Sequence, residues 1–403
     1  MLKAKRAEIT YAMLLTLYAL GFTNLFLRGS LGILGPSLTT EMQLTPAMLS
    51  AVASSFFFAY AAMQIPTGML LDRFGPRKTL AALLLFTALG AGIFAISRSA
   101  SELIAARVLM GIGCAGIFTG AFYVLNRWVE PQHVVTQSGL LNSIASIGGL
   151  CATTPLAALI GLIGWRESYW LFTAGVVLLL LAVAFIVRDD PHGGSTAKSS
   201  TTETLGDVFR GVAEAIRQPG MKRLIFVGIP LASQTTLLGA WAAPYLRDVH
   251  ALGPLARGNV LLAMAVCSIF GHVLYGMLAR HFNSIRWVIF TGMCLVIMSL
   301  TAMTLMTKPS IYLVAPLFCV ISISTMYPML AFAHSRGLVP PHLVGRGVAV
   351  ANMGIMTAIA SSQMLFGWVV GQFPLEPSGM SPEIAYRWAF GTLAVLSVAA
   401  AAI

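Results

Sequence analysis

The chain has 403 residues, of which 57% are hydrophobic and only 10% are charged. A water-soluble globular protein has about 25% charged residues, so this composition excludes a body surrounded by water and predicts a membrane protein. The net charge of +11 does not indicate a nucleic-acid-binding protein, because the basic residues lie in short loops between apolar segments.

Six apolar segments of membrane-spanning length occupy the first half of the chain. A spanning helix needs about 20 apolar residues, and each segment meets that length. The short basic stretch before the first segment is followed by no clear cleavage site, so we interpret that segment as a helix rather than a removed signal peptide. The predicted spans are 11–34, 48–71, 79–97, 102–127, 135–163 and 169–187.

The loop between the second and third spans concentrates one acidic residue, several basic residues and a turn-forming Gly-Pro pair. Its pattern, G-x-L-x-D-R-x-G-x-R-K, resembles the loop between helices 2 and 3 of the major facilitator superfamily of secondary transporters. The resemblance implies a conformational latch on the cytoplasmic side. A plainer interpretation is a charged loop that only sets membrane orientation. The latch residues are Gly68, Asp72, Arg73, Gly75, Arg77 and Lys78.

A linker at 188–221 separates the two halves of the chain. Its beginning is rich in Gly, Ser and Thr, and its remainder has apolar residues at helical spacing, which predicts an amphipathic helix at the cytoplasmic interface. We therefore expect an N-terminal bundle over 1–187 and a C-terminal bundle over 222–403. The second set of spans is 222–246, 257–279, 287–307, 311–334, 344–372 and 386–403.

Internal similarity supports two related halves. The stretch Thr67–Phe74 matches Tyr275–Phe282, and a second match starts at Arg127 and Arg336 with nearly the same offset. Such repeats predict two six-helix bundles related by an axis along the membrane normal. The predicted fold class is thus an all-α membrane protein with 12 transmembrane helices in two pseudo-symmetric bundles.

The distribution of Lys and Arg predicts the orientation. With the N-terminus in the cytoplasm, the cytoplasmic segments hold 17 basic residues and the external loops hold 6. By the positive-inside rule, both termini lie in the cytoplasm. For a bacterial chain this means a multi-pass protein of the cytoplasmic (inner) membrane.

Two arginines, Arg28 and Arg107, lie inside predicted spans, at similar depth below the outer surface. Two buried cations repel each other unless an anion lies between them, and guanidinium groups suit carboxylate or phosphate. An ionisable group inside the membrane is a candidate functional site. The alternative is that each arginine binds backbone carbonyls and holds helices together, and the glycines after Arg107 favour close helix packing.

The segment from Asn24 to Leu31 is similar to the N-x-x-D-R-x-x-L pattern of the anion:cation symporter branch of the superfamily. That resemblance implies binding of an organic anion by Arg28 and Arg107. Leu27 stands at the aspartate position, and Cys114 stands where the branch often has glutamate. Both differences remove proton-carrying acids, so the sequence favours anion binding without proton coupling through these positions.

Further polar residues lie on helices that line the transport path in this superfamily. For each of them, bonding between helices is the alternative to substrate contact. His272 is also able to titrate near neutral pH. These additional candidates are Asn24, Tyr60, Gln64, Asn142, Gln234, His272, Tyr327 and Asn352.

The sequence thus predicts a secondary active or facilitative transporter, working as a monomer in the lipid bilayer, for a small carboxylate-type anion and with or without a coupling ion. We expect no cofactor, metal or nucleic acid. The alternatives within the same fold are a drug or cation exporter and a nitrate- or organophosphate-type exchanger. An intramembrane enzyme is not favoured, because the sequence has no HExxH, GxSxG or phosphate-binding loop. A non-transporting receptor would bind ligand without flux.

Overall fold

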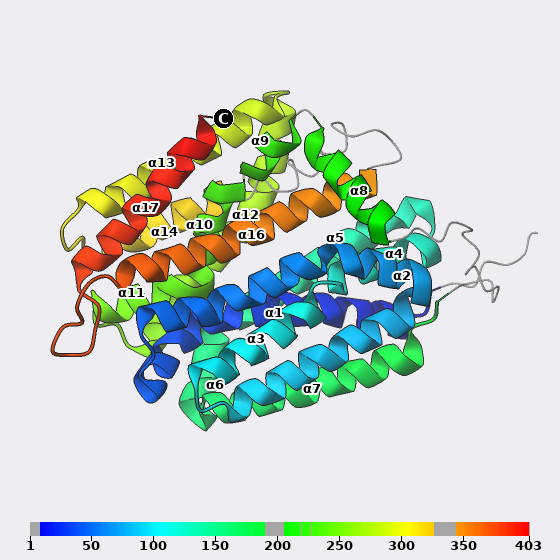
Figure 1. Cartoon of the computed structure of the whole chain (residues 1–403), viewed down its shortest axis with the longest axis horizontal. Helices are drawn as coiled ribbons and strands as arrows, with labels where there is room; N and C mark the ends of the chain where they lie inside the picture. Colours follow the sequence, from blue (N-terminus) through cyan, green and yellow to red (C-terminus); the bar gives the residue numbers. More distant parts are fainter. Residues whose placement is uncertain (1–8, 190–204, 219, 227, 326–343, 403) are drawn as a thin grey trace, which may run out of the picture.

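The computed structural model describes residues 9–189, 205–218, 220–226, 228–325 and 344–402, and the regular structure in these ranges is helical (Figure 1). Nine helices in the described ranges are long and apolar enough to cross a membrane. Two shorter apolar helices, Thr154–Ile163 and Ile311–Ser324, accompany them. The predicted all-α membrane architecture is confirmed.

The described helices follow the predicted spans, with α8 in the predicted linker. Those of the first half are α1 (Tyr11–Met42), α2 (Pro46–Ile96), α3 (Ala100–Cys114), α4 (Ile117–Trp128), α5 (Pro131–Cys151), α6 (Thr154–Ile163) and α7 (Trp165–Ile186). Those of the second half are α8 (Leu205–Arg217), α9 (Met221–Phe226), α10 (Gly228–Thr236), the π-helix η1 (Leu237–Trp241), α11 (Ala242–Asp248), α12 (Pro254–His281), α13 (Ile285–Leu305), α14 (Ile311–Ser324), α16 (Val344–Val370) and α17 (Glu383–Ala401).

Three predicted spans are interrupted, and two run together. The fourth span is α3 followed by α4, the fifth is α5 followed by α6, and the seventh is the series α9, α10, η1 and α11. The second and third spans form the continuous element α2, whose only non-helical dihedral angles are those of Gly75 (φ 78°, ψ 166°). Each of the twelve predicted spans therefore contains at least one described helix, and α1 extends beyond its predicted end to Met42.

Local sequence signals explain several helix ends. The hydroxyl of Thr10 accepts a hydrogen bond from the Met13 amide at the start of α1. Thr45 caps α2 in the same way, and Pro46 follows it at the first helical position. Side-chain oxygens satisfy amide groups that the first helical turn leaves without partners, which fixes where each helix begins.

Helices from the two halves meet along α2 and α16 and along α1 and η1. Figure 1 shows α16 lying beside α2 at the boundary between the first-half helices and the second-half helices. Gly32 of α1 is essential for close approach to η1, because a Cβ there would collide with the Leu238 carbonyl oxygen. Small residues allow such backbone proximity in membrane helix pairs.

The amphipathic helix predicted in the linker is α8, at the right of Figure 1. Its buried residues Val212 and Ala215 form a cluster with Val350 and Ala351 of α16, and Ile65 of α2 packs against the same cluster. The apolar face of α8 is therefore covered by protein in this region, at the end of the helix array that carries the Gly75 turn. Sequence periodicity predicted the helix but not what its apolar face contacts.

Candidate functional site

Arg28 lies on α1 at the boundary between the two halves. Its guanidinium carbon lies 5.3 Å from the ring centre of Phe57 and 5.9 Å from that of Tyr60, both on α2. Across the boundary, its Nη2 donates to the sulfur of Met356 on α16 at 3.8 Å. Arg28 is half-buried, so two aromatic faces and a soft sulfur replace part of its water.

Within the described part of the chain, Arg28 forms no ion pair with a carboxylate. The preceding residue, Leu27, is fully buried and provides no charge. A guanidinium that lacks a counter-charge in a low-dielectric environment attracts an anion strongly, because both its charge and its hydrogen-bond donors remain to be satisfied.

The side-chain amides of Asn24 and Gln64 donate hydrogen bonds to backbone carbonyls where α3 ends and α4 has not yet begun. Asn24 Nδ2 donates to the carbonyl of Cys114 at 2.7 Å, and Gln64 Nε2 donates to that of Ala115 at 3.4 Å. A helix break leaves carbonyl groups without their usual amide partners, and in a membrane these need partners from the protein. The two side chains thus stabilise the break, while Asn24 Oδ1 is buried and has no hydrogen-bond partner in the described ranges.

Gln64 also links the two halves. Its Oε1 accepts a hydrogen bond from Asn352 Nδ2 of α16 at 2.8 Å. Tyr60, one turn before Gln64, is 4% exposed and interacts with Arg28, Asn24 and Gln64. Asn24, Arg28, Tyr60, Gln64 and Asn352 therefore form one polar group, which we call the Arg28 cluster.

Arg107 of α3 has a different environment. It is 1% exposed, and its Nη1 donates to the backbone carbonyl of Leu27 at 3.1 Å. Its guanidinium carbon lies 4.5 Å from the ring centre of Phe56, and its Nε finds no hydrogen-bond partner within the described part of the chain. Arg107 thus reaches the backbone of α1 one residue before Arg28 and helps to hold that segment of α1 in place.

The remaining described candidates form hydrogen bonds with residues outside the Arg28 cluster. Asn142 Nδ2 donates to the Ser138 carbonyl of its own helix at 3.0 Å. Gln234 of α10 and His272 of α12 both contact Ser268: Gln234 Nε2 donates to its hydroxyl at 3.2 Å, and His272 Nδ1 lies 2.9 Å from its carbonyl. His272 is exposed and Gln234 is buried. Tyr327 lies outside the described residues.

The predicted latch segment turns at Gly75, whose φ of 78° favours glycine. Asp189, which follows α7, closes this turn: its Oδ1 accepts a hydrogen bond from the Arg77 amide at 2.9 Å. A Cβ at Gly75 would lie only 2.6 Å from the same oxygen. Asp189 thus caps the helix that resumes after the turn, and sequence analysis did not identify it because it lies 112 residues from Arg77.

Among the other residues of the turn, Arg73 stacks on Phe74, with its guanidinium carbon 5.4 Å from the ring centre. At Gly68, no atom of the described part of the chain lies within 4 Å of an added Cβ. Asp72 and Lys78 complete the segment. The turn itself is therefore held by the contact between the Asp189 carboxylate and the Arg77 amide.

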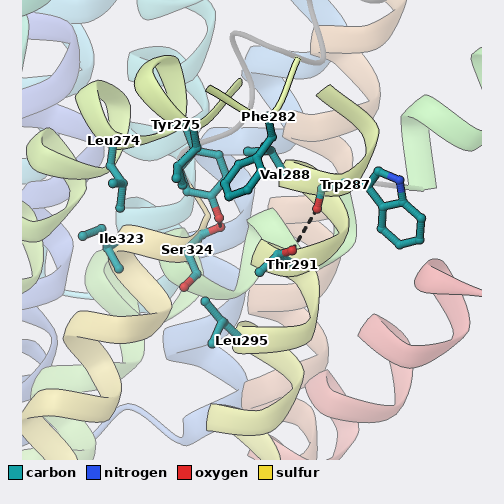
Figure 2. Close-up of a pocket in the computed structure, with 10 residues that line it drawn as sticks. Leu274, Tyr275, Phe282, Trp287, Val288, Thr291, Leu295, Ile323 and Ser324 are labelled. Atoms are coloured by element: carbon teal, nitrogen blue, oxygen red, sulfur yellow. Dashed lines mark hydrogen bonds between the residues drawn. The ribbon is translucent and has the colours of Figure 1, made fainter. Parts of the chain in front are cut away.

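A separate cavity of about 310 Å³ lies between α12, α13 and α14. Figure 2 shows its lining, which is mainly apolar, with Tyr275 and Thr291 among the polar exceptions. The Tyr275 hydroxyl donates to the Ser324 carbonyl at 2.7 Å, and Thr291 Oγ1 donates to the Trp287 carbonyl. None of the described lining residues is charged, so this part of the cavity does not suit an anion.

Phe57 and Met356 contact Arg28 but were not among the residues predicted from the sequence, although the sequence carried a signal for each. Phe57, Tyr60 and Gln64 recur at helical spacing on one face of α2. Met356 is one turn after Asn352 on α16. An aromatic or sulfur-containing residue that shares a helix face with a polar candidate is therefore itself a candidate contact of a nearby arginine, because a guanidinium group packs against such side chains.

The family model described as Major Facilitator Superfamily matches residues 17–360. The chain belongs to this superfamily. The family resemblance predicted from the loop at 68–78 is thus confirmed, and the superfamily consists of transporters rather than enzymes.

Curated relatives in the superfamily include a probable sulfoacetate transporter of Cupriavidus necator, which is 29% identical over 44% of this chain and 42% of the relative. A probable L-galactonate transporter of Escherichia coli is 28% identical over 72% of this chain and 64% of the relative. A probable galactarate/D-glucarate transporter of Pseudomonas putida is 27% identical over 69% of this chain and 66% of the relative. The chain thus matches less than two thirds of the length of each of these relatives.

Solved structures with the same fold include a bacterial homologue of the human lysosomal transporter Spinster, with a TM-score of 0.80 at 19% identity, covering 100% of this chain and 96% of that one. The nucleoside transporter NupG matches with a TM-score of 0.75 at 16% identity, covering 98% of this chain and 99% of that one. At these identities the matches establish the fold, and the major facilitator fold predicted from the sequence is confirmed.

Proposed function

We propose that this chain is a secondary transporter that carries a small organic anion of the carboxylate type by alternating access. The observation that carries the proposal is the Arg28 guanidinium, which is half-buried, lies between helices of both halves and has no carboxylate partner in the described part of the chain. A bound anion would supply the missing charge, and the planar guanidinium group favours carboxylate by bidentate hydrogen bonding.

The names of the relatives support the same substrate class. Sulfoacetate, galactonate and galactarate are the compounds in those names, and each carries at least one carboxylate. Aromatic faces at Phe57 and Tyr60 suit the carbon skeleton of such a compound. Asn352 and Gln64 provide amide groups for its remaining polar atoms.

The position of the Arg28 cluster suits alternating access. Gln64 and Asn352 bond α2 to α16, and Arg28 reaches Met356 on α16. Relative motion of a bundle over 1–187 and a bundle over 222–403, joined by 188–221, would break and remake these contacts. An anion that binds both sides would change the balance between the states by its differential affinity for them.

Within this proposal, Arg28 binds the anion directly, and Arg107 positions it by holding the α1 backbone at Leu27. The segment 68–78 acts as the latch at the predicted cytoplasmic end, with Asp189 as an additional member of it. The protein lies in the cytoplasmic membrane with both termini in the cytoplasm. The coupling ion and the oligomeric state, predicted as a monomer, remain predictions from the sequence.

Flux in reconstituted vesicles tests the substrate class. Purified protein in proteoliposomes should exchange radiolabelled galactonate, and unlabelled galactarate or sulfoacetate should compete. Arg28→Ala should lose this flux, whereas Arg127→Ala should keep it. Arg127 is a matched control because it also stacks on an aromatic ring, that of Tyr123 at 4.4 Å, but lies exposed at the end of α4.

The same vesicles separate the alternatives. Flux of organic cations or hydrophobic drugs, without flux of any carboxylate, would indicate a drug or cation exporter and refute the proposal. Saturable binding of galactonate without flux would indicate a receptor. A raised melting temperature with an anion identifies a ligand before flux is measured, since a ligand that binds the folded state stabilises it.

The latch is tested by Asp72→Asn. This change removes one charge with almost no change of volume, so membrane insertion and folding should persist. Because the segment lies where the two halves are predicted to move, initial flux should fall. Wild-type initial flux in Asp72→Asn, at equal reconstituted amounts, would argue against a latch and for a loop that only sets orientation.

A further inference from the structure

A second polar pocket lies at the opposite end of the molecule from the Gly75 turn. It has a volume of about 320 Å³ and is lined by the end of α1, from Pro36 to Glu41, together with Arg247 of α11 and Arg257 of α12. The label of α11 marks this end at the left of Figure 1. The pocket therefore joins the two halves of the chain far from the Arg28 cluster.

Arg257 is the unusual member of this pocket. It is 6% exposed, and its Nε and Nη1 have no hydrogen-bond partner among the residues that the structure describes. A buried guanidinium without acceptors is costly, because it loses hydration and gains no compensating bonds. Arg257 lies in the first turn of α12, whose N-terminus has no side-chain cap, so the helix dipole adds to the positive potential.

The second arginine of the pocket is already partly satisfied. Arg247 Nη1 donates to the Pro36 carbonyl at 3.0 Å and to Thr40 Oγ1 at 3.4 Å, and its Nε pairs with Asp248 Oδ1 at 2.7 Å. Arg247 thus connects α11 to the end of α1. Arg247 therefore lines the pocket with its donors largely bonded, whereas the Nε and Nη1 donors of Arg257 lack acceptors in the described part of the chain.

Neither carboxylate near the pocket is available to Arg257. The second oxygen of Asp248 accepts hydrogen bonds from the Tyr386 hydroxyl at 2.7 Å and from the Ser381 amide at 3.2 Å. Glu41 pairs with Arg166 and accepts a hydrogen bond from Trp165 Nε1 at 2.6 Å. Both acids are held by other groups, so neither serves as the acceptor that Arg257 lacks.

The charged residues of the pocket, counted together with their ion-pair partners, leave a surplus of one positive charge. Arg166, Arg247 and Arg257 carry three positive charges, and Glu41 and Asp248 carry two negative charges. One negative charge with oxygen acceptors would neutralise the group and satisfy the Arg257 donors. We propose that this pocket is a second anion site, which binds the carboxylate group of a small organic anion through Arg257.

The existence of the site stands on Arg257 and its surroundings, whereas its identification as a station for the transported anion rests on the proposed function. An anion held there bridges the end of α1 and the start of α12. It also concentrates substrate near one mouth of the transport path, which accelerates entry. If the predicted orientation holds, this mouth is the external one.

Thermal melting of the purified full-length protein tests the site, with sodium chloride replaced by sodium galactonate or sodium acetate at constant ionic strength. In Arg28→Ala, which lacks the central cation, both salts should still raise the melting temperature saturably. Arg28→Ala/Arg257→Gln should lose the rise. Arg28→Ala/Arg280→Gln should keep it, because Arg280 is exposed at the other end of the same helix.

Arg257→Lys provides a variant that keeps the charge and so should fold as the wild type does. It loses the planar donor pair, and the half-saturating concentration of galactonate should rise by about tenfold. A rise that persists in Arg28→Ala/Arg257→Gln, or no rise in Arg28→Ala with either carboxylate, would overturn the site. A rise with inorganic phosphate but not with acetate would overturn its assignment to carboxylates.

The melting experiment does not depend on flux. If the wild type transports no carboxylate, the proposed function fails, while a saturable effect that requires Arg257 still supports the second site. If flux behaves as proposed and the Arg257 variants melt identically with and without carboxylates, only the second site fails.

Discussion

Replacement of Arg28 by alanine removes the charge that we propose to hold the substrate in the Arg28 cluster. A carboxylate about 4 Å from a guanidinium gains about 4 kcal/mol at an effective dielectric constant of about 20. Measured losses for truncated buried charge pairs run from about 2 kcal/mol upward. Since about 1.4 kcal/mol corresponds to a tenfold change, we expect anion affinity to fall by about 30- to 1,000-fold.

Arg28→Lys should be milder. Lysine keeps the charge but loses the planar fork and the stacking on Phe57 and Tyr60, whose ring centres lie 5.3 Å and 5.9 Å from the guanidinium carbon. One lost hydrogen bond and part of a cation–π contact together amount to about 1–2 kcal/mol. Affinity should therefore lie between those of the wild type and Arg28→Ala.

Equilibrium binding of radiolabelled galactonate to purified protein measures these affinities, and melting without ligand measures folding. Arg107→Ala should lower the melting temperature more than Arg28→Ala does, because Arg107 is 1% exposed and its loss leaves a cavity against Phe56. In the double variant, additive losses of affinity indicate that Arg107 acts separately from the anion, and a second loss close to zero indicates that both hold one anion. Wild-type galactonate affinity in Arg28→Ala would refute the placement of the site.

Three further predictions concern the moving parts. Gly75→Ala should impair folding or flux, because φ 78° with ψ 166° strains any residue but glycine by about 1–3 kcal/mol and the new Cβ would lie 2.6 Å from the Asp189 carboxylate oxygen. Gly68→Ala, whose Cβ would meet no described atom within 4 Å, should not; equal melting and flux of the two variants would contradict this. Asn352→Leu should lower stability by about 1 kcal/mol, through loss of the 2.8 Å bond between α16 and α2, and an unchanged melting temperature would argue against it. An imposed pH gradient should not drive uphill accumulation of galactonate, because the sequence places no carboxylate in the middle of a predicted span. His272 is the other group able to carry a proton there, so accumulation that survives His272→Gln would refute this prediction.

The sequence alone determined the features that depend on local composition. Apolar runs of membrane length predicted the spans, since any helix that crosses lipid must be apolar over about 20 residues. The Gly75-Pro76 pair predicted the turn, because glycine tolerates the positive φ that the structure has there. Apolar spacing predicted α8, and each of these signals lies within a short stretch of chain.

Only the tertiary structure decided which polar groups meet. Asn24 and Gln64 donate to carbonyls at the break between α3 and α4, and the sequence did not predict that the fourth span breaks there. Asp189 caps a turn more than a hundred residues away, and Arg257 lacks the partner that Arg247 has. The residue type gives the charge and the hydrogen-bond donors of a side chain. Whether those donors find acceptors depends on which distant segments pack beside them, and this is decided by the tertiary structure.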